Sequence, residues 1–498
     1  MAKERSFANA VKWAYTANWG EKGLASVFAI VLAGMLGPAA FGVVAIAMVY
    51  STVLQMFLDQ GFVAALIQRN DLQPEHLDAV FWMDQVIAVV LVLVSIPVSA
   101  WWAARNHAQN SASLVFVMSF EIPIMGLSIV QSAVLRREMD FRSLSVCANV
   151  SALIGGLAGL GMALMRFGAW SLVGQQLVRD AVNTVLLWKS SRWRPRFEFS
   201  WKHLVELTDF SIKHFIAQLG ILADMQASSI ILGLYFGPVA LGLYRIADRI
   251  MSSVVYVATS AVQSVSLPEF SRLQHKPDEL RKSVMTCLHL TSSVTVPALF
   301  GLAAVATPLM ATIGRSWTPA SRCLQVLCIL GVAIVFAYFT GPLLSALSRP
   351  REIAVLEWVR MAIGIAVLIP AAMIVRSHSI PAQIMGIALA RFATGALIVA
   401  PGFLIILMKI CRITLRDFLV LIAPSVLSAA ATVVSVFLVE STRVLHGALP
   451  ISQLSCEVAV GGAVGLIVLL ACDRPLRAAT AGLLSRSYDR FMEARQSA

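Results

Sequence analysis

Long apolar runs recur along the whole chain and are separated by short polar connections. Most runs hold about 20 residues, the length that a helix needs to cross a hydrocarbon layer about 30 Å thick. Stretches such as 86–100 and 459–471 do not alternate between apolar and polar residues, so the strands of a membrane barrel are not indicated. The pattern predicts an all-α polytopic membrane protein with about fourteen transmembrane helices. The expected spans are 12–36, 41–66, 79–103, 113–135, 144–165, 168–188, 210–236, 240–267, 285–311, 322–347, 353–375, 382–408, 417–439 and 452–472.

The composition agrees with this pattern and leaves little material for a soluble domain. Of the 498 residues, 58% are hydrophobic and 13% are charged, whereas soluble proteins carry about 25% charged residues. The 7 cysteines are scattered, and no histidine cluster accompanies them. We therefore expect the cysteines to pack as small apolar residues within helices, and we expect neither a metal nor another cofactor.

The net charge of +12 raises the question of nucleic acid binding, but the basic residues are arranged by loop. The termini and the loops on one predicted side hold 26 Lys and Arg, whereas the opposite loops hold six. Basic loops stay on the cytoplasmic side of a membrane. We therefore expect both termini in the cytoplasm and an even number of spans. The basic charge then reflects topology and attraction to anionic lipids, and no nucleic acid partner is expected.

An internal repeat divides the chain. Residues 32–47 (LAGMLGPAAFGVVAIA) align without a gap with residues 232–247 (LGLYFGPVALGLYRIA), and both contain Gly-Pro-x-Ala-x-Gly at a predicted outer turn. A duplication with six spans in each copy puts both copies in the same orientation. They would be related by a pseudo-two-fold axis along the membrane normal, with a central cavity between them. The expected organisation is a six-helix lobe at 1–200, a second at 201–410, two added helices at 411–475 and a cytoplasmic tail at 476–498.

Charged side chains inside the predicted spans form the candidate site. A charge in the middle of a membrane helix costs about 2.5–3.5 kcal/mol on insertion scales, so it persists where it is paired, faces a cavity or takes part in transport. Arg245 and Arg249 lie one turn apart in the eighth span, with Asp248 beside them. The cationic candidates are Lys22, Arg179, Lys213, Arg245, Arg249, Arg360 and Arg391, and the carboxylate candidates are Glu21, Glu121, Asp209, Asp224 and Asp248.

Two interpretations fit these residues. In the first, they line a polar cavity whose cations bind pyrophosphate, because a guanidinium makes paired hydrogen bonds to phosphate oxygens. In the second, neighbouring opposite charges neutralise each other within the fold. The pairs would be Glu21–Lys22, Asp209–Lys213, Arg245–Asp248 and Glu357–Arg360.

The order of these features resembles a known family. The block 25–69, with LGPAAFGVVAIA followed by LDQGFVAALIQR, is similar to the polysaccharide transporters of the Wzx type (WzxC-like), which belong to the multidrug/oligosaccharidyl-lipid/polysaccharide flippase superfamily. In the second repeat, FGPVALGLYRIADRI and the later SLPEFSRL at 266–273 agree with that resemblance. The resemblance covers most of the chain, and no binding residue of the family is carried over by position.

The resemblance implies a flippase of the bacterial inner membrane that moves undecaprenyl-pyrophosphate-linked oligosaccharides from the cytoplasmic to the periplasmic leaflet. Its partners would be that lipid-linked substrate and the membrane lipids, together with a polysaccharide polymerase and the chain-length machinery. The export would serve exopolysaccharide, capsule or O-antigen assembly. Coupling to protons or sodium through Glu21, Asp209 or Asp224 is a further hypothesis.

Three alternatives to this function stay open. A cation-coupled multidrug exporter shares the architecture, although its cavity should be more acidic and aromatic than the candidates here. A lipid II flippase of peptidoglycan synthesis also shares the architecture. A membrane polymerase or ligase is disfavoured by the short loops and by the absence of P-loop, HExxH and DxD patterns, so we expect no enzymatic activity.

Overall fold

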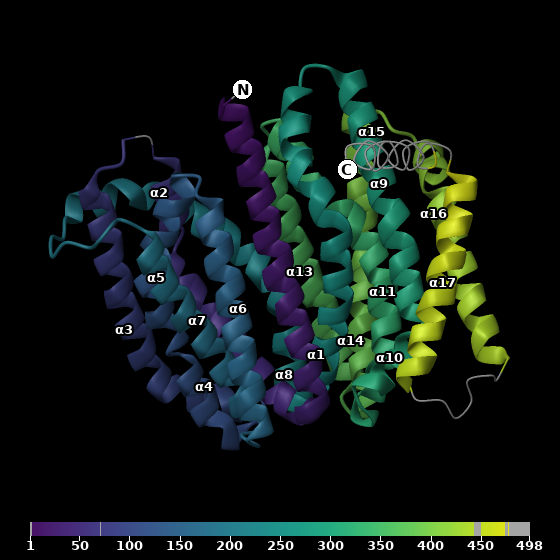
Figure 1. Ribbon diagram of the computed structural model, residues 1–498, viewed down its shortest axis with the longest axis horizontal. Coiled ribbons are helices and arrows are strands. Elements are labelled where there is room, and N and C mark those ends of the chain that lie inside the picture. Colours follow the sequence, from purple (N-terminus) through teal and green to yellow (C-terminus); the bar gives the residue numbers. More distant parts are fainter. Residues whose placement is uncertain (1, 70, 443–449, 474–476, 478–498) are drawn as a thin grey trace, which may run out of the picture. The chain divides into compact units, whose positions relative to one another are not determined.

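The computed structural model describes residues 2–69, 71–442, 450–473 and 477, and within them it contains helices, turns and connections but no strand (Figure 1). The first part of the chain forms α1 (Ala2–Asp59), α2 (Phe62–Gln68), α3 (Pro74–Arg105), η1 (Gln109–Ser111), α4 (Ala112–Met118), α5 (Glu121–Arg137), α6 (Phe141–Leu164), α7 (Trp170–Ser190) and α8 (Trp201–Arg272). The rest forms α9 (Pro277–Ala304), α10 (Ala306–Ile313), η2 (Arg315–Ala320), α11 (Ser321–Ala337), α12 (Thr340–Ala346), α13 (Pro350–Val375), α14 (Ile380–Thr394), η3 (Gly395–Val399), α15 (Ala400–Cys411), α16 (Leu415–Ser441) and α17 (Pro450–Cys472).

Among the described residues, 11 segments are helical, apolar and long enough to cross a membrane. The prediction of an all-α polytopic membrane protein is therefore confirmed. Two of these segments, Gly20–Asp59 and Gln218–Ser260, each contain a break in the helix, at Gly37 and Gly237. The 21-residue helix α7 is not among the 11 segments. The number of fourteen spans stays a prediction.

The two Gly-Pro turns of the internal repeat have the same backbone conformation. Gly37 has φ 75° and ψ 171°, and Gly237 has φ 79° and ψ −171°. A positive φ of this size favours glycine, because a Cβ would strain the backbone. In both copies the following proline then starts the next helix, where its missing N–H costs no hydrogen bond. These turns divide both α1 and α8 into two helices, as the sequence predicts.

The two repeated turns also contact each other. A Cβ added to Gly42 would overlap the carbonyl of Pro238, and a Cβ added to Gly242 would overlap the carbonyl of Pro38. Each copy therefore places its glycine against the proline of the other copy. Such a reciprocal contact is the mark of a two-fold relation between two segments. The assignment of whole lobes to 1–200 and 201–410 stays a prediction.

The chain forms two compact units, which are described separately. One combines Met1–Ser253, Ile313–Cys323 and Arg351–Thr394, and the other combines Val254–Thr312, Leu324–Pro350 and Gly395–Ala498. The predicted tail at 476–498 lies outside the described residues, apart from Arg477.

In the first unit, α6 lies against both α1 and α7. Glycines on α6 make this close packing possible. A Cβ at Gly156 would overlap the ring of Phe28 in α1, and a Cβ at Gly155 would lie 2.6 Å from the Cβ of Arg179 in α7. Small residues let membrane helices approach closely and gain van der Waals contact. This approach fixes the face of α7 that carries Arg179.

In the second unit, α16 lies side by side with α17 and also packs on α9 (Figure 1). Small polar residues form the contact. The Ser428 hydroxyl donates to the carbonyl of Gly465 at 2.7 Å, and the Ser425 hydroxyl donates to Ser292 of α9 at 3.3 Å. A Cβ at Gly461 would lie 2.8 Å from Val436. The two helices predicted after residue 411 therefore dock through small residues and hydroxyl hydrogen bonds, as membrane helices commonly do.

The close contact at Gly42 yields a stability prediction. We expect Gly42→Ala to lower the melting temperature of the detergent-purified protein, because the added methyl group overlaps the Pro238 carbonyl and overpacking costs about 1–3 kcal/mol. Gly23→Ala, in the helix that precedes the Gly37 break, is the control, since a Cβ there meets nothing within 4 Å. That control should leave the melting temperature unchanged or raise it slightly, because alanine favours helix. Equal melting temperatures for the two variants would contradict the reciprocal contact.

Candidate functional site

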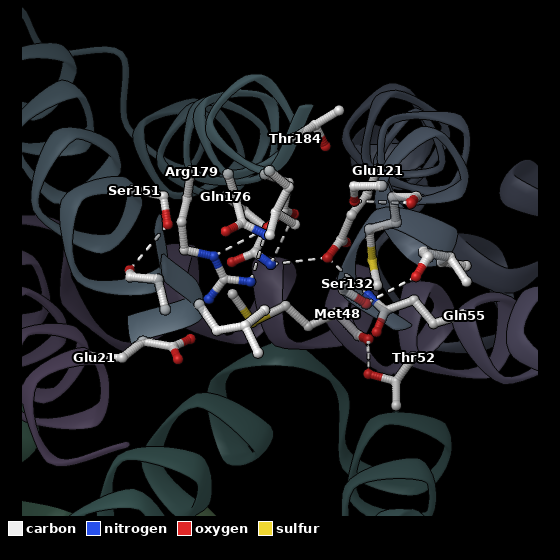
Figure 2. Close-up of a pocket in the computed structure, with 18 of the residues that line it drawn as sticks. Glu21, Met48, Thr52, Gln55, Glu121, Ser132, Ser151, Gln176, Arg179 and Thr184 are labelled. Carbon is white, nitrogen blue, oxygen red and sulfur yellow. Dashed lines mark hydrogen bonds and ion pairs between the residues drawn. The ribbon is translucent and has the colours of Figure 1, made fainter. Parts of the chain in front are cut away.

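A cavity of about 750 Å³ lies within the first unit. Its walls come from α1, α5, α6, α7 and the second half of α8, with Met118 of α4 at one edge. Glu21 and Arg179 lie toward one end of the cavity, and Glu121 and Gln55 lie toward the other (Figure 2). The lining thus brings together residues from helices far apart in the sequence, including two of the predicted candidates from α8, Arg245 and Arg249.

The Glu121 carboxylate is the centre of a hydrogen-bond network. It is 1% exposed, yet it accepts from the Ser51 hydroxyl at 2.5 Å, from Gln55 Nε2 at 2.7 Å and from Gln176 Nε2 at 2.8 Å. Glu121 is also the first residue of α5, where the helix dipole favours a negative charge. These three donors from α1 and α7 satisfy the carboxylate. The network therefore ties three helices together around the cavity.

Arg179 lies on the face of α7 that the glycines of α6 hold in place. Its Nη2 lies 3.0 Å from Oδ1 of Asp180, and Gln176 Nε2 donates to Oδ2 of the same carboxylate at 3.2 Å. Arg179 is therefore neutralised largely by its own neighbour. Asp180 therefore compensates the charge of the Arg179 guanidinium at the cavity wall. We expect Arg179 to contribute less to binding an anionic ligand than its position suggests.

Arg245 and Arg249 differ from Arg179 in their partners. Arg245 Nη1 donates to the Ser229 hydroxyl at 3.4 Å, and Arg249 Nη2 donates to the Ala25 carbonyl at 2.8 Å. Both partners are neutral. Within the described part of the chain, neither guanidinium has a carboxylate oxygen within 4 Å, so the predicted Arg245–Asp248 ion pair is not formed. The Asp248 carboxylate attracts Arg245 through space without contacting it. Two guanidinium groups thus line the cavity without a direct ion pair, which is costly unless water or an anion solvates them.

A smaller cavity of about 250 Å³ adjoins this region. It shares Met48, Gln176, Arg179, Arg245 and Arg249 with the larger cavity. Asp248 lines the smaller cavity but not the larger one. The two arginines thus stand at the junction of two hollows.

Another group of predicted candidates forms a separate charge cluster. Arg360 Nη2 lies 3.1 Å from Asp224 Oδ2 and 2.6 Å from Glu357 Oε2, so the Glu357–Arg360 pair foreseen from the sequence is present. Arg391 donates to the main-chain carbonyl of Asp224 at 3.1 Å. None of these four residues is among those that line the two cavities of the described structure. Their observed arrangement is the internal salt bridging that was the second interpretation.

Of the four remaining candidates, Glu21 lines a cavity and the other three are not placed in one. The side chains of Lys22 and Asp209 are exposed, and neither residue lines either of the two cavities in the described structure. The side chain of Lys213 lies outside the described residues. Glu21, one residue before Lys22, does line the larger cavity.

Several cavity residues were not predicted from the sequence. Gln55, Gln176 and Asn183 line the larger cavity, and so does Arg136 in the last turn of α5. Gln176, Arg179 and Asn183 are spaced by three and four residues, so they share one face of α7. That spacing was the available signal, since a polar stripe along an otherwise apolar helix indicates a wetted or paired face.

The chain is similar to known proteins of polysaccharide biosynthesis. The family described as "Polysaccharide biosynthesis protein" matches residues 31–322, more than half of the chain. The chain is 30% identical over 308 residues to the succinoglycan biosynthesis transport protein ExoT of Rhizobium meliloti (strain 1021), covering 62% of each chain. It is 22% identical over 357 residues to the lipopolysaccharide biosynthesis protein WzxC of Escherichia coli (strain K12), covering 70% of this chain and 71% of the relative. The match to ExoT thus spans less than two thirds of its length.

Solved structures share the fold. The inward closed conformation of the lipid II flippase MurJ superposes with a TM-score of 0.71 at 14% identity and covers 93% of this chain and 99% of that chain. An inward-facing multidrug resistance transporter of the MATE family, in the MOP superfamily, superposes with a TM-score of 0.62 at 14% identity and covers 81% of this chain and 98% of that chain. Among the proteins named here, ExoT is a transport protein, MurJ is a flippase and the MATE protein is a transporter. At 14% identity, the two solved structures show the fold alone.

The network around Glu121 yields a second stability prediction. We expect Glu121→Ala to lower the melting temperature strongly, because it leaves three donors without their acceptor and each unsatisfied buried group costs about 1–3 kcal/mol. Glu121→Gln is the matched control. Its amide oxygen still accepts from two donors, and the Ser51 hydroxyl can turn to accept from the amide nitrogen. The melting temperature of this control should stay near that of the wild type. An alanine variant as stable as the wild type would show that the carboxylate does not hold the helices together.

Proposed function

Because the chain belongs to the polysaccharide biosynthesis protein family, we propose that it is a flippase for undecaprenyl-pyrophosphate-linked oligosaccharides. It moves them from the cytoplasmic to the periplasmic leaflet of the bacterial inner membrane, for exopolysaccharide, capsule or O-antigen assembly. The observation that carries the proposal is the pair of guanidinium groups on α8, Arg245 and Arg249, which line the cavity and whose hydrogen-bond partners are neutral.

The pyrophosphate is the part of the substrate that this pair recognises. A guanidinium presents donors in a planar fork that matches two phosphate oxygens, and it keeps its charge at any physiological pH. Two such groups one helical turn apart suit a diphosphate better than a single charge would. An anion at this position also stabilises the arginines in place of water when the cavity is closed to solvent.

The amide and hydroxyl groups around the cavity provide a surface for the sugar units. Gln55, Asn183 and Thr52 line the larger cavity, and such groups donate to and accept from sugar hydroxyls. The lipid tail does not need the cavity, because it stays in the bilayer while the head group crosses. The cavity would open alternately to the two sides of the membrane, as in transporters built from repeats.

The membrane potential favours this direction of movement. A negatively charged head group that leaves a cell with a negative interior moves down the potential, and each charge gains about 2.3 kcal/mol per 100 mV. Both chain ends would lie in the cytoplasm. A polysaccharide polymerase and the chain-length machinery would receive the flipped product. Coupling to a cation through Glu21 is an additional hypothesis, because this carboxylate lines the larger cavity.

A lipid II flippase and a cation-coupled multidrug exporter remain the alternatives. The structural similarity to MurJ and to the MATE transporter concerns the fold alone, so it does not select a substrate. A lipid II flippase is compatible with an arginine pair, since lipid II also carries pyrophosphate. An exporter of cationic drugs is disfavoured, because two guanidinium groups without a direct ion pair repel a cation. The named relatives in polysaccharide biosynthesis favour the oligosaccharide substrate.

The arginine pair yields the functional prediction. We expect Arg245→Ala combined with Arg249→Ala to abolish polysaccharide export at a normal protein level, because the anionic head group loses its counter-charges. The measurement is complementation of a deletion strain, with surface polysaccharide and lipid-linked intermediates quantified. The deletion strain itself should accumulate lipid-linked oligosaccharide in the cytoplasmic leaflet.

The matched control is Arg315→Ala combined with Arg322→Ala, which removes two exposed arginines that line neither described cavity. This control should export normally. Full export by the Arg245/Arg249 variant would remove the pair from the site. Unchanged surface polysaccharide in the deletion strain would contradict the proposed function itself.

A further inference from the structure

The segment Lys189–Lys202, which runs from the last turn of α7 to the start of α8, exposes both aromatic and basic side chains. Three aromatic side chains in it are strongly exposed: Phe197 at 93%, Trp201 at 64% and Phe199 at 51%. Four exposed cations surround them, namely Lys189, Arg192, Arg196 and Lys202. Large exposed aromatic groups are costly in water, so a surface that holds several of them indicates a partner.

This segment is held firmly against α3. The Arg196 N–H donates to the buried carboxylate of Asp78 at 2.9 Å, and the Trp82 indole N–H donates to the Arg196 carbonyl at 2.6 Å. The ring of Phe197 packs on that of Trp82, with a centroid distance of 5.0 Å. The exposed side chains are therefore not on a loose loop, because the backbone beneath them is fixed.

The ends of the segment are fixed as well. Arg194 donates to the carbonyls of Trp188 and Ser191, so its charge is used within the segment. At the start of α8, Glu206 pairs with Arg69 and accepts from His76. The hydrogen bond from His76 and the charge of Arg69 hold the pKa of Glu206 below its ordinary value. Glu206 thus stays ionised in these contacts at neutral pH and offsets no charge of the exposed cations.

The position along α3 sets the level of the segment relative to a membrane. Asp78 and Trp82 lie in the first turns of the candidate span Pro74–Arg105. The contacts to these residues place the segment beside the start of that candidate span, where the polar and apolar parts of a bilayer would meet. Aromatic rings gather at that depth, with basic side chains directed to the lipid phosphates.

We propose that residues Lys189–Lys202 form an interfacial anchor that binds anionic lipid head groups, with Phe197, Phe199 and Trp201 inserted among the acyl-chain ends. The charge of the segment selects this partner. In the described structure none of the four cations has a carboxylate oxygen within 4 Å, and Glu198 is the one acid in the segment. The anchor is independent of the cargo of the protein and works equally for any transported molecule.

The experiment compares lipid retention by native mass spectrometry of the full-length protein, purified from mixed phosphatidylglycerol and phosphatidylcholine. The test variant combines Lys189→Gln, Arg192→Gln, Arg196→Gln and Lys202→Gln. The wild type should retain phosphatidylglycerol preferentially. The test variant should lose that preference by more than about tenfold, because the attractions of four basic residues to an anionic surface add together.

The matched control removes the same charge elsewhere, through Lys282→Gln, Lys409→Gln, Arg412→Gln and Arg416→Gln. All four residues are exposed, and no cluster of exposed aromatic residues surrounds them. This control should keep the lipid preference. Equal retention by the test variant and the wild type, or an equal loss in both variants, would overturn the proposal.

The insertion of the aromatic side chains is tested by a separate measurement, which does not require the four-residue charge variant to fold. Brominated phosphatidylglycerol quenches tryptophan fluorescence on contact, so Trp201→Phe should reduce the quenched fraction. An unchanged quenched fraction would show that Trp201 does not touch lipid, and the surface would then be open to a protein partner instead.

Discussion

The cost of a charge inside a membrane is the constraint on which this structure depends. The described part of the chain meets it in three ways. Glu121 is surrounded by three donors, Arg360 is paired with two carboxylates, and Arg179 is paired with its own neighbour. Each of these charges is satisfied by the protein, so each contributes to the fold. Arg245 and Arg249 differ from these charges, because the groups to which they donate hydrogen bonds are neutral. A charge that has no direct ion pair and also lines a cavity is one that a ligand can use.

Close approach of helices is what brings these groups together. The glycines of the two repeated turns allow α1 and α8 to touch through their backbones, and Gly155 allows α7 to approach α6 beside Arg179. Without these contacts, the residues of α1, α7 and α8 would not share one cavity wall. Hydroxyl groups and glycines serve the same purpose between α16 and α17. The chemistry of the site thus rests on small residues that carry no function themselves.

The sequence predicted the parts of the fold that depend on local pattern. Apolar runs identified the helices, and the repeat identified the breaks at Gly37 and Gly237. It could not predict which charges pair, because pairing depends on how helices rotate against each other. Arg360 and Arg245 looked alike in the sequence, each with an acid three residues away, yet one is paired and the other is not. Gln55 and Gln176 were missed as cavity residues for the same reason, since their shared partner Glu121 lies on a third helix.

The most direct test of the account is a structure of the protein with an undecaprenyl-pyrophosphate-linked oligosaccharide bound, determined by electron cryo-microscopy in lipid nanodiscs. The account predicts that the pyrophosphate lies in the larger cavity within hydrogen-bonding distance of Arg245 and Arg249, with the sugar units toward Gln55 and Asn183. A pyrophosphate held instead by Arg360 and Arg391, or a cavity left empty at saturating substrate, would contradict it.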